Sequence, residues 1–271
     1  MNVKDALKQA SSLVPIDAHV LLAHVLRTTR AALYAFDDRM ITSEEKTKWT
    51  ALLSKRMEGF PVAYLIGEKE CMGLMFEVNP DVLIPRPDTE LLIETALSLL
   101  KPGATVLDIG TGSGVIAISI ASHAADCSVL GSDISTAALS VAARNISRHH
   151  LKNVSLQQSD LFSSITASFD MIVSNPPYIA ANDPHLNSDI RFEPALALVA
   201  GEDGLDVFRQ LITQAPAHLN AGGWICLEHG YKQAAAVQLL LKEQGFQAIS
   251  TLIDLAGNDR VTVAHWFGSR C

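Results

Sequence analysis

The chain has 271 residues, of which 48% are hydrophobic and 18% charged, and its formal net charge is -8. This composition supplies a sizeable core, which excludes a mainly disordered or fibrous protein. The acidic balance, with no run of Lys and Arg longer than two residues, argues against a protein dedicated to binding nucleic acid.

The cysteine spacing and the hydropathy of the sequence indicate the cellular compartment of the protein. The four cysteines are too far apart for a CxxC pair, and none has a histidine at metal-binding spacing. We therefore expect reduced thiols and no metal site. The first residues lack the pattern of a signal peptide, and no apolar run approaches the roughly 20 residues that span a bilayer. These features predict a cytoplasmic protein with no membrane segment.

Residues 1–58 have the periodicity of helices and no strand pattern. Asp17 is expected to cap the second helix. Thr42 and Glu45 have the spacing of a capping box, and the helix that they start should end at residues 59–61, which are Gly-Phe-Pro. The segment is predicted to be a small helical module.

Residues 62–84 change in character and predict a short hairpin between two domains. Residues 75–78 have strand composition, and the Asn-Pro-Asp sequence at 79–81 is a turn signal. Asp88 then follows two prolines, and we expect it to cap a helix over residues 89–100.

From residue 104 onward, strand and helix patterns alternate, which predicts a parallel sheet with helices on both faces. A final pair of strands around residues 256–259 is expected to be antiparallel. The predicted strands are 104–109, 128–133, 154–160, 169–175, 224–230, 248–255 and 260–267, and the predicted helices are 115–122, 135–149 and 205–219.

A glycine loop, Gly110-Thr111-Gly112-Ser113-Gly114, joins the first of these strands to its helix. Glycine permits a tight turn and lets a ligand approach the backbone closely. The start of the next helix offers unpaired N–H groups to a carboxylate or phosphate. The spacing GxGxG differs from the dinucleotide fingerprint GxGxxG. A ligand-binding loop and a purely structural turn both fit this pattern.

Acidic residues end the next two strands. Asp133 stands where an acid can accept hydrogen bonds from both hydroxyls of a ribose. Its alternative role is a helix cap, because Ser135 and a helix follow at once. Asp160 could face an adenine or act as a cap or loop acid.

The tetrapeptide Asn175-Pro176-Pro177-Tyr178 ends the fourth strand. A residue before proline is held extended, so the Asn175 side chain is aimed. Pro176 has no N–H and presents its carbonyl without a competing donor. The Asn175 side-chain oxygen and this carbonyl can accept both hydrogens of a planar –NH₂ group, beside the flat face of Tyr178. Because ligands bind at the carboxyl ends of parallel strands, we predict that this motif and the glycine loop share one site.

These motifs together resemble class I S-adenosylmethionine-dependent methyltransferases of the amino-group type. Longer segments are similar to the bacterial release-factor glutamine methyltransferases, the PrmC/HemK family, and the resemblance covers nearly the whole chain. The similar segments are PVAYLIGEKE, VLIPRPDTELLIE, VSNPPYIA, DIRFEPALAL, GEDGLDVFRQLI, GGWICLEHG and GNDRV.

The resemblance implies an α/β fold: a Rossmann-like methyltransferase domain with a seven-stranded, mostly parallel sheet, preceded by a helical bundle. The implied domains are a substrate-docking bundle over 1–72, a hairpin linker over 73–84 and the methyltransferase over 85–271. The implied reaction is methylation of the side-chain amide nitrogen of the glutamine in the GGQ loop of peptide-chain release factors. S-adenosyl-L-methionine is the implied cofactor and S-adenosyl-L-homocysteine the product, with no metal, membrane or direct nucleic-acid partner.

The resemblance also assigns residues. The glycine loop, from Gly110 through Thr111, Gly112 and Ser113 to Gly114, would hold the methionyl end of the cofactor, and Asp133 its ribose. Leu161, where some relatives have Trp, would line the adenine pocket. Asn175 to Tyr178 would hold the glutamine amide, with Asn175 also next to the cofactor.

Two other substrates remain open from the residues. A DNA adenine methyltransferase could use the same tetrapeptide on an exocyclic –NH₂ group, but the acidic balance argues against it. A ribosomal-protein glutamine methyltransferase would need the same acceptor site. A cofactor-binding interaction module without activity is the remaining alternative, and the intact Asn175 and glycine loop argue against that.

Overall fold

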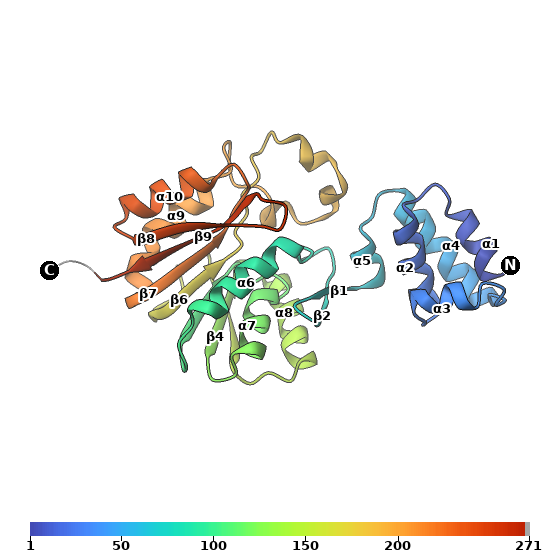
Figure 1. Ribbon diagram of the computed structural model, residues 1–271, viewed down its shortest axis with the longest axis horizontal. Coiled ribbons are helices and arrows are strands. Elements are labelled where there is room, and N and C mark those ends of the chain that lie inside the picture. The colour runs from blue at the N-terminus through green and yellow to red at the C-terminus, as the bar shows by residue number, and fades with distance from the viewer. Residues whose placement is uncertain (269–271) are drawn as a thin grey trace. The chain divides into compact units, whose positions relative to one another are not determined.

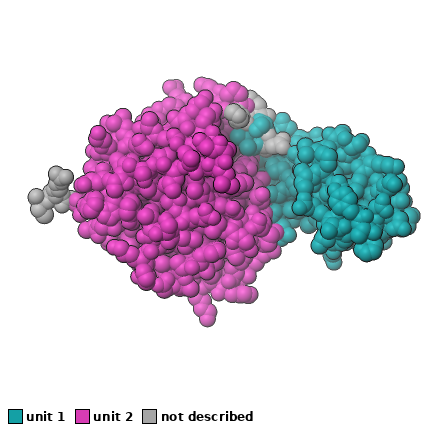
Figure 2. Space-filling view, viewed as in Figure 1, with its two compact units in different colours: residues 1–68, 187–192 teal, residues 69–186, 193–271 magenta. Residues whose placement is uncertain are grey.

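The computed structural model describes residues 1–268, and for His185, Asn187 and Asp189 it describes the backbone alone. The chain divides into two compact units (Figure 2). The smaller comprises residues 1–68 and 187–192, and the larger comprises residues 69–186 and the chain from 193 onward.

The smaller unit is helical (Figure 1). Its core contains Leu21, Leu22, Leu33 and Trp49, each at most 2% exposed. The helices are α1 Val3–Gln9, α2 Pro15–Val25, α3 Arg30–Ala35, α4 Ser43–Met57 and α5 Val62–Ile66.

The predicted capping box at the start of α4 is confirmed. The Glu45 amide donates to Thr42 Oγ1 at 3.2 Å, and the Thr42 amide donates to Glu45 Oε2 at 2.8 Å. Helix α5 was not predicted, because its sequence VAYLI is rich in residues that favour strands. Pro61 precedes its first turn and Gly67, in the left-handed conformation, ends it.

The predicted cap at Asp17 is wrong. Helix α2 begins at Pro15, with Val14 at the N-cap position and no side-chain cap. Proline suits the first helical position because its fixed φ fits the helix and its missing N–H would have no partner there. Asp17 therefore lies in the first turn, where it forms an ion pair with Arg56 of α4 at 2.9 Å.

The larger unit is built on a seven-stranded sheet with the order β5-β4-β3-β6-β7-β9-β8. Strands β3 to β7 run parallel, and β9 is antiparallel to β7 and β8. The α/β fold class and the antiparallel final pair are thus confirmed. The strands are β3 Thr105–Ile109, β4 Ser128–Asp133, β5 Val154–Gln158, β6 Phe169–Ser174, β7 Leu219–Glu228, β8 Gln247–Ile253 and β9 Asp259–Trp266.

Helices cover both faces of this sheet, with α6, α7 and α8 on one face and α9 and α10 on the other (Figure 1). A two-stranded hairpin precedes α6. Helix α10 was not predicted, although Ala, Leu, Lys and Glu are strong helix formers. The bounds are β1 Glu68–Cys71, β2 Leu74–Glu77, α6 Pro87–Leu99, α7 Val115–His123, α8 Thr136–Arg148, α9 Asp206–Gln214 and α10 Ala234–Glu243.

The predicted cap at Asp88 is also wrong, for the same reason as at Asp17. Helix α6 begins at Pro87, with Arg86 at the N-cap position and no side-chain cap. Asp88 lies in the first turn and forms an ion pair with Arg260 of β9 at 3.2 Å.

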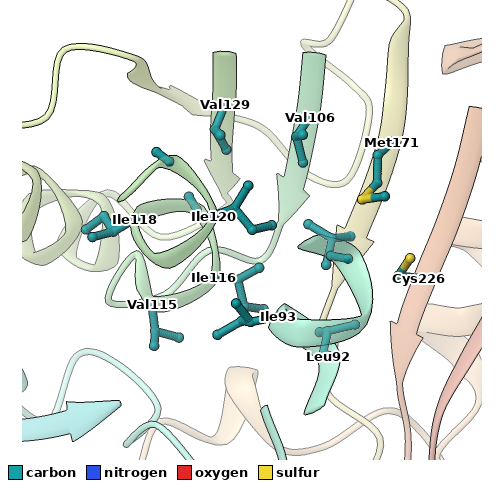
Figure 3. Close-up of a cluster of buried hydrophobic side chains, with 14 of the residues drawn as sticks. Leu92, Ile93, Val106, Val115, Ile116, Ile118, Ile120, Val129, Met171 and Cys226 are labelled. Carbon is teal, nitrogen blue, oxygen red and sulfur yellow. The ribbon is translucent and has the colours of Figure 1, made fainter. Parts of the chain in front are cut away.

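Neighbouring residues of the central strands point to opposite faces of the sheet. Val106 of β3 packs with Ile93 of α6 and Ile116 of α7 on one face (Figure 3). The next residue, Leu107, packs on the other face with Phe208 of α9. Because both faces are covered, the strands are nearly continuous runs of apolar residues, and the polar groups gather at their ends.

Candidate active site

A cavity of about 340 Å³ lies at the carboxyl ends of strands β3 to β6. This is the edge of a parallel sheet where ligands bind, and the volume falls within the usual range for small-molecule sites. Its lining residues are Asp81, Val82, Leu83, Ile109, Gly110, Gly112, Asp133, Ile134, Ser135, Ala138, Ser159, Asp160, Leu161, Asn175, Pro176, Pro177, Pro194, Leu196, Ala197, Val207 and Gln210.

Two glycines of the loop after β3 present their backbone to this cavity. Gly110 has a φ of +72°, and a Cβ built on it would meet no atom within 4 Å. Gly112 has a φ of +56°, and its amide donates to Asp133 Oδ2 at 2.9 Å. The left-handed conformation favours glycine at both positions, and the absence of side chains leaves room for a ligand against the backbone.

The other three residues of the loop do not line the cavity. The Thr111 hydroxyl donates to Asp108 Oδ2 at 2.6 Å. The Ser113 carbonyl accepts from Asn145 Nδ2 at 2.8 Å. A Cβ at Gly114 would lie 2.8 Å from Cδ1 of Ile118, so this glycine permits close packing within the unit. Thr111, Ser113 and Gly114 thus shape the loop from its buried side.

Asp108, a residue without a predicted role, anchors the loop. Its side chain is fully buried, and Oδ2 accepts from the Thr111 hydroxyl and from the Ala117 amide at 3.1 Å. Burial raises the pKa of this carboxyl to about 7. An acidic residue just before a glycine loop is visible in the sequence, but its burial is not.

Asp133 ends β4 at the wall of the cavity. Its two oxygens accept from the backbone amides of Gly112 and Ser135, each at 2.9 Å. Burial raises the pKa of this carboxyl, and the two amides lower it. The alternative that Asp133 is the cap of α8 is wrong, because Ser135 is the N-cap residue and accepts from the Ala138 amide at 3.1 Å.

The loop after β5 supplies an apolar part of the wall. Asp160 and Leu161 both line the cavity, and Leu161 has a φ of +47°. Ile134, after β4, also lines it and is 44% exposed. Apolar side chains on two adjacent loops suit the flat face of an aromatic ring system.

The Asn-Pro-Pro-Tyr motif divides between the cavity and the interior. Asn175, Pro176 and Pro177 line the cavity, and Asn175 Nδ2 donates to Thr89 Oγ1 of α6 at 3.3 Å. Tyr178 does not line it. The Tyr178 hydroxyl donates to Glu228 Oε1 at 3.4 Å, and burial raises the pKa of this phenol.

Two cavity-lining segments were not predicted, residues 81–83 before α6 and residues 194–197 after β6. The buried carboxylate of Glu193 joins them. Its Oε2 accepts from the Ile84 amide at 2.9 Å, and its Oε1 pairs with the Arg86 guanidinium. The turn signal at 79–81 and the segment DIRFEPALAL are the only hints of these segments in the sequence.

Two kinds of feature, a cluster of metal-ligating side chains and a membrane-crossing helix, were sought among the residues that the structure describes. Within it, no group of three His, Cys, Asp or Glu side chains could hold a metal ion. No helix among the described residues combines the length and the hydropathy needed to cross a membrane.

The chain is similar to known proteins along nearly its whole length. Residues 2–67 match the family PrmC N-terminal domain, and residues 87–192 match the family Methyltransferase small domain. The release factor glutamine methyltransferase of Pseudomonas aeruginosa is 46% identical over 267 residues, which cover 97% of each chain. That of Aliivibrio fischeri is 41% identical over 269 residues, covering 98% of this chain and 95% of that protein.

Solved structures share the fold at lower identity. The ribosomal protein L11 methylase of Lactobacillus delbrueckii subsp. bulgaricus has 25% identity and a TM-score of 0.53, covering 71% of this chain and 84% of that one. The 16S rRNA N2 G1207 methyltransferase of T. Thermophilus, in complex with AdoMet and guanosine, has 24% identity and a TM-score of 0.56, covering 73% of this chain and 49% of that one.

Proposed function

Because the chain belongs to the family of release factor glutamine methyltransferases, we propose that it methylates the side-chain amide nitrogen of the glutamine in the GGQ loop of a peptide-chain release factor. The methyl donor is S-adenosyl-L-methionine, and S-adenosyl-L-homocysteine is the product. The observation that carries the proposal is the presence of Asn175 and Pro176 in the same cavity as Gly110, Gly112 and Asp133.

The cavity fits this cofactor by its chemistry. The backbone at Gly110 faces open space, as a ligand held against the loop requires. The Asp133 carboxylate is a charged acceptor at the wall, suited to ribose hydroxyls. Leu161 and Ile134 give an apolar surface for the adenine. Gly110, Gly112, Asp133 and Leu161 would hold the cofactor, which supplies an electrophilic methyl group when bound.

The part of the site that binds the glutamine amide promotes the reaction by orienting that amide toward the methyl donor. An amide nitrogen is a poor nucleophile because its lone pair is delocalised, and the motif contains no strong base. Asn175 Oδ1 and the Pro176 carbonyl accept the two hydrogens of the glutamine –NH₂ group and so fix its plane. Positioning of this kind can lower a barrier by up to roughly 7–11 kcal/mol. The proton leaves the nitrogen during or after the transfer, to Asn175 or to water.

The units have separate roles in this proposal. Residues 1–72 dock the protein substrate, residues 73–84 join the two domains, and residues 85–271 catalyse the methyl transfer. The reaction takes place in the cytoplasm. Support for docking comes from large apolar side chains on the surface of the smaller unit, where Tyr34, Phe36 and Met40 are 70%, 62% and 68% exposed. Exposed apolar groups of this size are typical of protein-binding surfaces.

Mass spectrometry of a release factor treated with enzyme and cofactor tests the function. We expect one added methyl group on the glutamine of the GGQ loop, and none when GGQ is changed to GGA. Equal labelling of both forms would exclude this glutamine. Labelling of a ribosomal protein or of duplex DNA, with the release factor unlabelled, would assign the same pocket to one of the two other substrates.

A further inference from the structure

One wall of the cavity is a short segment, residues 194–197, to which the proposed reaction assigns no role. Pro194, Leu196 and Ala197 line the cavity. Residues Ala195–Ala197 form a single 3₁₀ turn, in which the Ala197 amide donates to the Pro194 carbonyl at 2.9 Å. We call residues 194–197 the lip, and its two ends show which part of the site it belongs to.

Glu193, the residue before the lip, fixes the first end. Its side chain is 2% exposed, and both of its oxygens are engaged: Oε2 accepts from the Ile84 amide at 2.9 Å, and Oε1 pairs with the Arg86 guanidinium. Arg86 is the N-cap residue of α6, whose Thr89 accepts a hydrogen bond from Asn175. Because hydrogen bonds to a charged group are strong, the start of the lip is tied to the helix that contacts Asn175.

The residues after the lip pair with the chain that follows the Asn-Pro-Pro-Tyr motif. The Ile179 amide donates to the Leu198 carbonyl at 2.8 Å, and the Ala200 amide donates to the Ile179 carbonyl at 3.0 Å. Leu198 and Ala200 are buried, and Ile179 comes directly after Tyr178. Both ends of the lip are therefore held beside the motif that binds the glutamine amide in the proposed function.

Leu196 lies in the turn between these two ends. It is 61% exposed, whereas Leu198, two residues later, is 6% exposed. A single exposed leucine is common on protein surfaces, but Leu196 also lines the cavity. A side chain that both lines a cavity and is open to solvent lies at the opening, where an entering substrate must pass it. Leu196 thus offers an apolar surface to the part of the substrate that stays outside the pocket.

When a glutamine side chain enters the pocket, the residues next to that glutamine remain at the opening. We propose that Leu196 is a specificity-determining residue: it packs against the backbone of the glycine that precedes the glutamine and occupies the space that a side chain on this glycine would need. This inference rests on the proposed function, because it names the part of the release factor that the lip recognises. Rejection of other sequences by such a clash is a common basis of specificity.

Selectivity between two release factors, one with GGQ and one with GAQ, tests the proposal. We expect the kcat/KM of the wild-type enzyme to be about 10²-fold lower for GAQ, and Leu196→Ala to reduce this ratio about tenfold, as small changes of volume do in specificity pockets. Any effect of GAQ on the release factor itself is the same for both enzymes and cancels. Leu239→Ala is the matched control, because Leu239 of α10 is 55% exposed and lies outside the cavity.

A second variant acts on the support of the lip. Glu193→Gln keeps the shape of the side chain but removes the charge that pairs with Arg86, so the lip is held less firmly and the ratio should fall in the same direction. The Kd for S-adenosyl-L-homocysteine, measured by calorimetry, should be unchanged in Leu196→Ala, because the lip is held beside the acceptor motif.

The outcomes separate this inference from the proposed function. If the wild type does not methylate the GGQ release factor, the proposed function is wrong and the inference falls with it. If the wild type methylates it but the ratio is unchanged in Leu196→Ala, only the inference is overturned. A weaker Kd for S-adenosyl-L-homocysteine with an unchanged ratio would place Leu196 against the cofactor and would also overturn it.

Discussion

The two compact units differ in charge and in what they bury. The smaller unit, residues 1–68 and 187–192, carries ten Lys and Arg residues against nine Asp and Glu residues, whereas the larger unit carries 11 against 20. The core of the helical unit is apolar, and its charged groups serve at the surface as caps and ion pairs. The sheet unit buries Asp108 and Glu228 completely. The buried carboxylates among the described residues, Asp108, Glu193 and Glu228, thus all lie in the sheet unit.

This contrast suggests that substitutions in the two units have different consequences. The carboxyl ends of the parallel strands bring charged and amide groups together in a confined place, at a cost in desolvation. The helical unit buries no carboxylate among its described residues and so has no comparable desolvation cost. Its proposed role is to offer a docking surface. Changes in the sheet unit should therefore act on turnover and pH dependence, and changes in the helical unit on stability and partner binding.

Substitution of Asn175 should have the largest effect. Asn175→Ala removes an aimed acceptor, and we expect kcat to fall about 10²- to 10³-fold, as when a preorganised group is lost from an active site. The Kd for the cofactor should change little, as isothermal titration calorimetry would measure. An unchanged kcat would show that the motif is not the acceptor site.

Deletion of residues 1–68 tests whether the helical unit supplies a docking surface that is separate from the active site. Residues 69–271 alone should bind the cofactor but have a kcat/KM for the release factor at least about 10²-fold lower, as expected when one of two linked binding surfaces is lost. Circular dichroism must first show that the fragment is folded. A folded fragment with the full kcat/KM would contradict a docking role for the helical unit.

The free energy of unfolding of the sheet unit should depend on pH through its two fully buried carboxyl groups. The folded-state pKa of about 7 for Glu228 and for Asp108 lies above the ordinary values of 4.5 and 3.8. Each group therefore stabilises the fold fully below its ordinary pKa, and this contribution is lost as the pH rises to about 7, at up to about 1.4 kcal/mol per pH unit. Glu228→Gln, which cannot ionise, should be more stable than the wild type in urea at pH 8. Equal stability at pH 8 would refute this.

Asp133 tests the cofactor side of the cavity. Asp133→Ala should weaken cofactor binding about 10- to 100-fold, because each hydrogen bond to a charged acceptor contributes roughly 1.5–3 kcal/mol. Asp126→Ala is the matched control, since the Asp126 carboxylate also accepts from a backbone amide, that of Gly103 at 3.0 Å, but lies outside the cavity. A wild-type Kd for Asp133→Ala would show that this acid only orders its loop.

The smallest expected effect is at the capping box. Thr42→Ala should lower the free energy of unfolding of the helical unit by about 1 kcal/mol, because the Glu45 amide loses its acceptor. Ser135→Ala removes the equivalent cap in the sheet unit. If calorimetry shows two transitions, each substitution should shift only one of them. A shift of both transitions by either substitution would mean that the units unfold together.

Local sequence patterns are enough to predict the succession of strands along the chain and the place of two motifs. Apolar runs mark strands buried on both faces, and glycine and proline mark where they end. Since parallel strands end at one edge, the patterns alone place Gly110, Asp133 and Asn175 at a common site. They mislead at the helix starts Pro15 and Pro87, because an acidic residue near a helix start is typical both of a cap and of the first turn.

Tertiary packing, in contrast, determines which side of each motif faces the cavity and what stands behind it. Thr111 and Ser113 turn inward, while Asp81 and Leu196 reach the wall. The contacts responsible join residues far apart in the chain: the partners of Asn175 and Ile84, which are Thr89 and Glu193, lie 86 and 109 positions away. Local patterns report periodicity and turns, but they carry no information on which distant side chain meets a given polar atom. The contacts of Asn175 with Thr89 and of Tyr178 with Glu228 therefore depend on the packing of α6 and β7 against the motif.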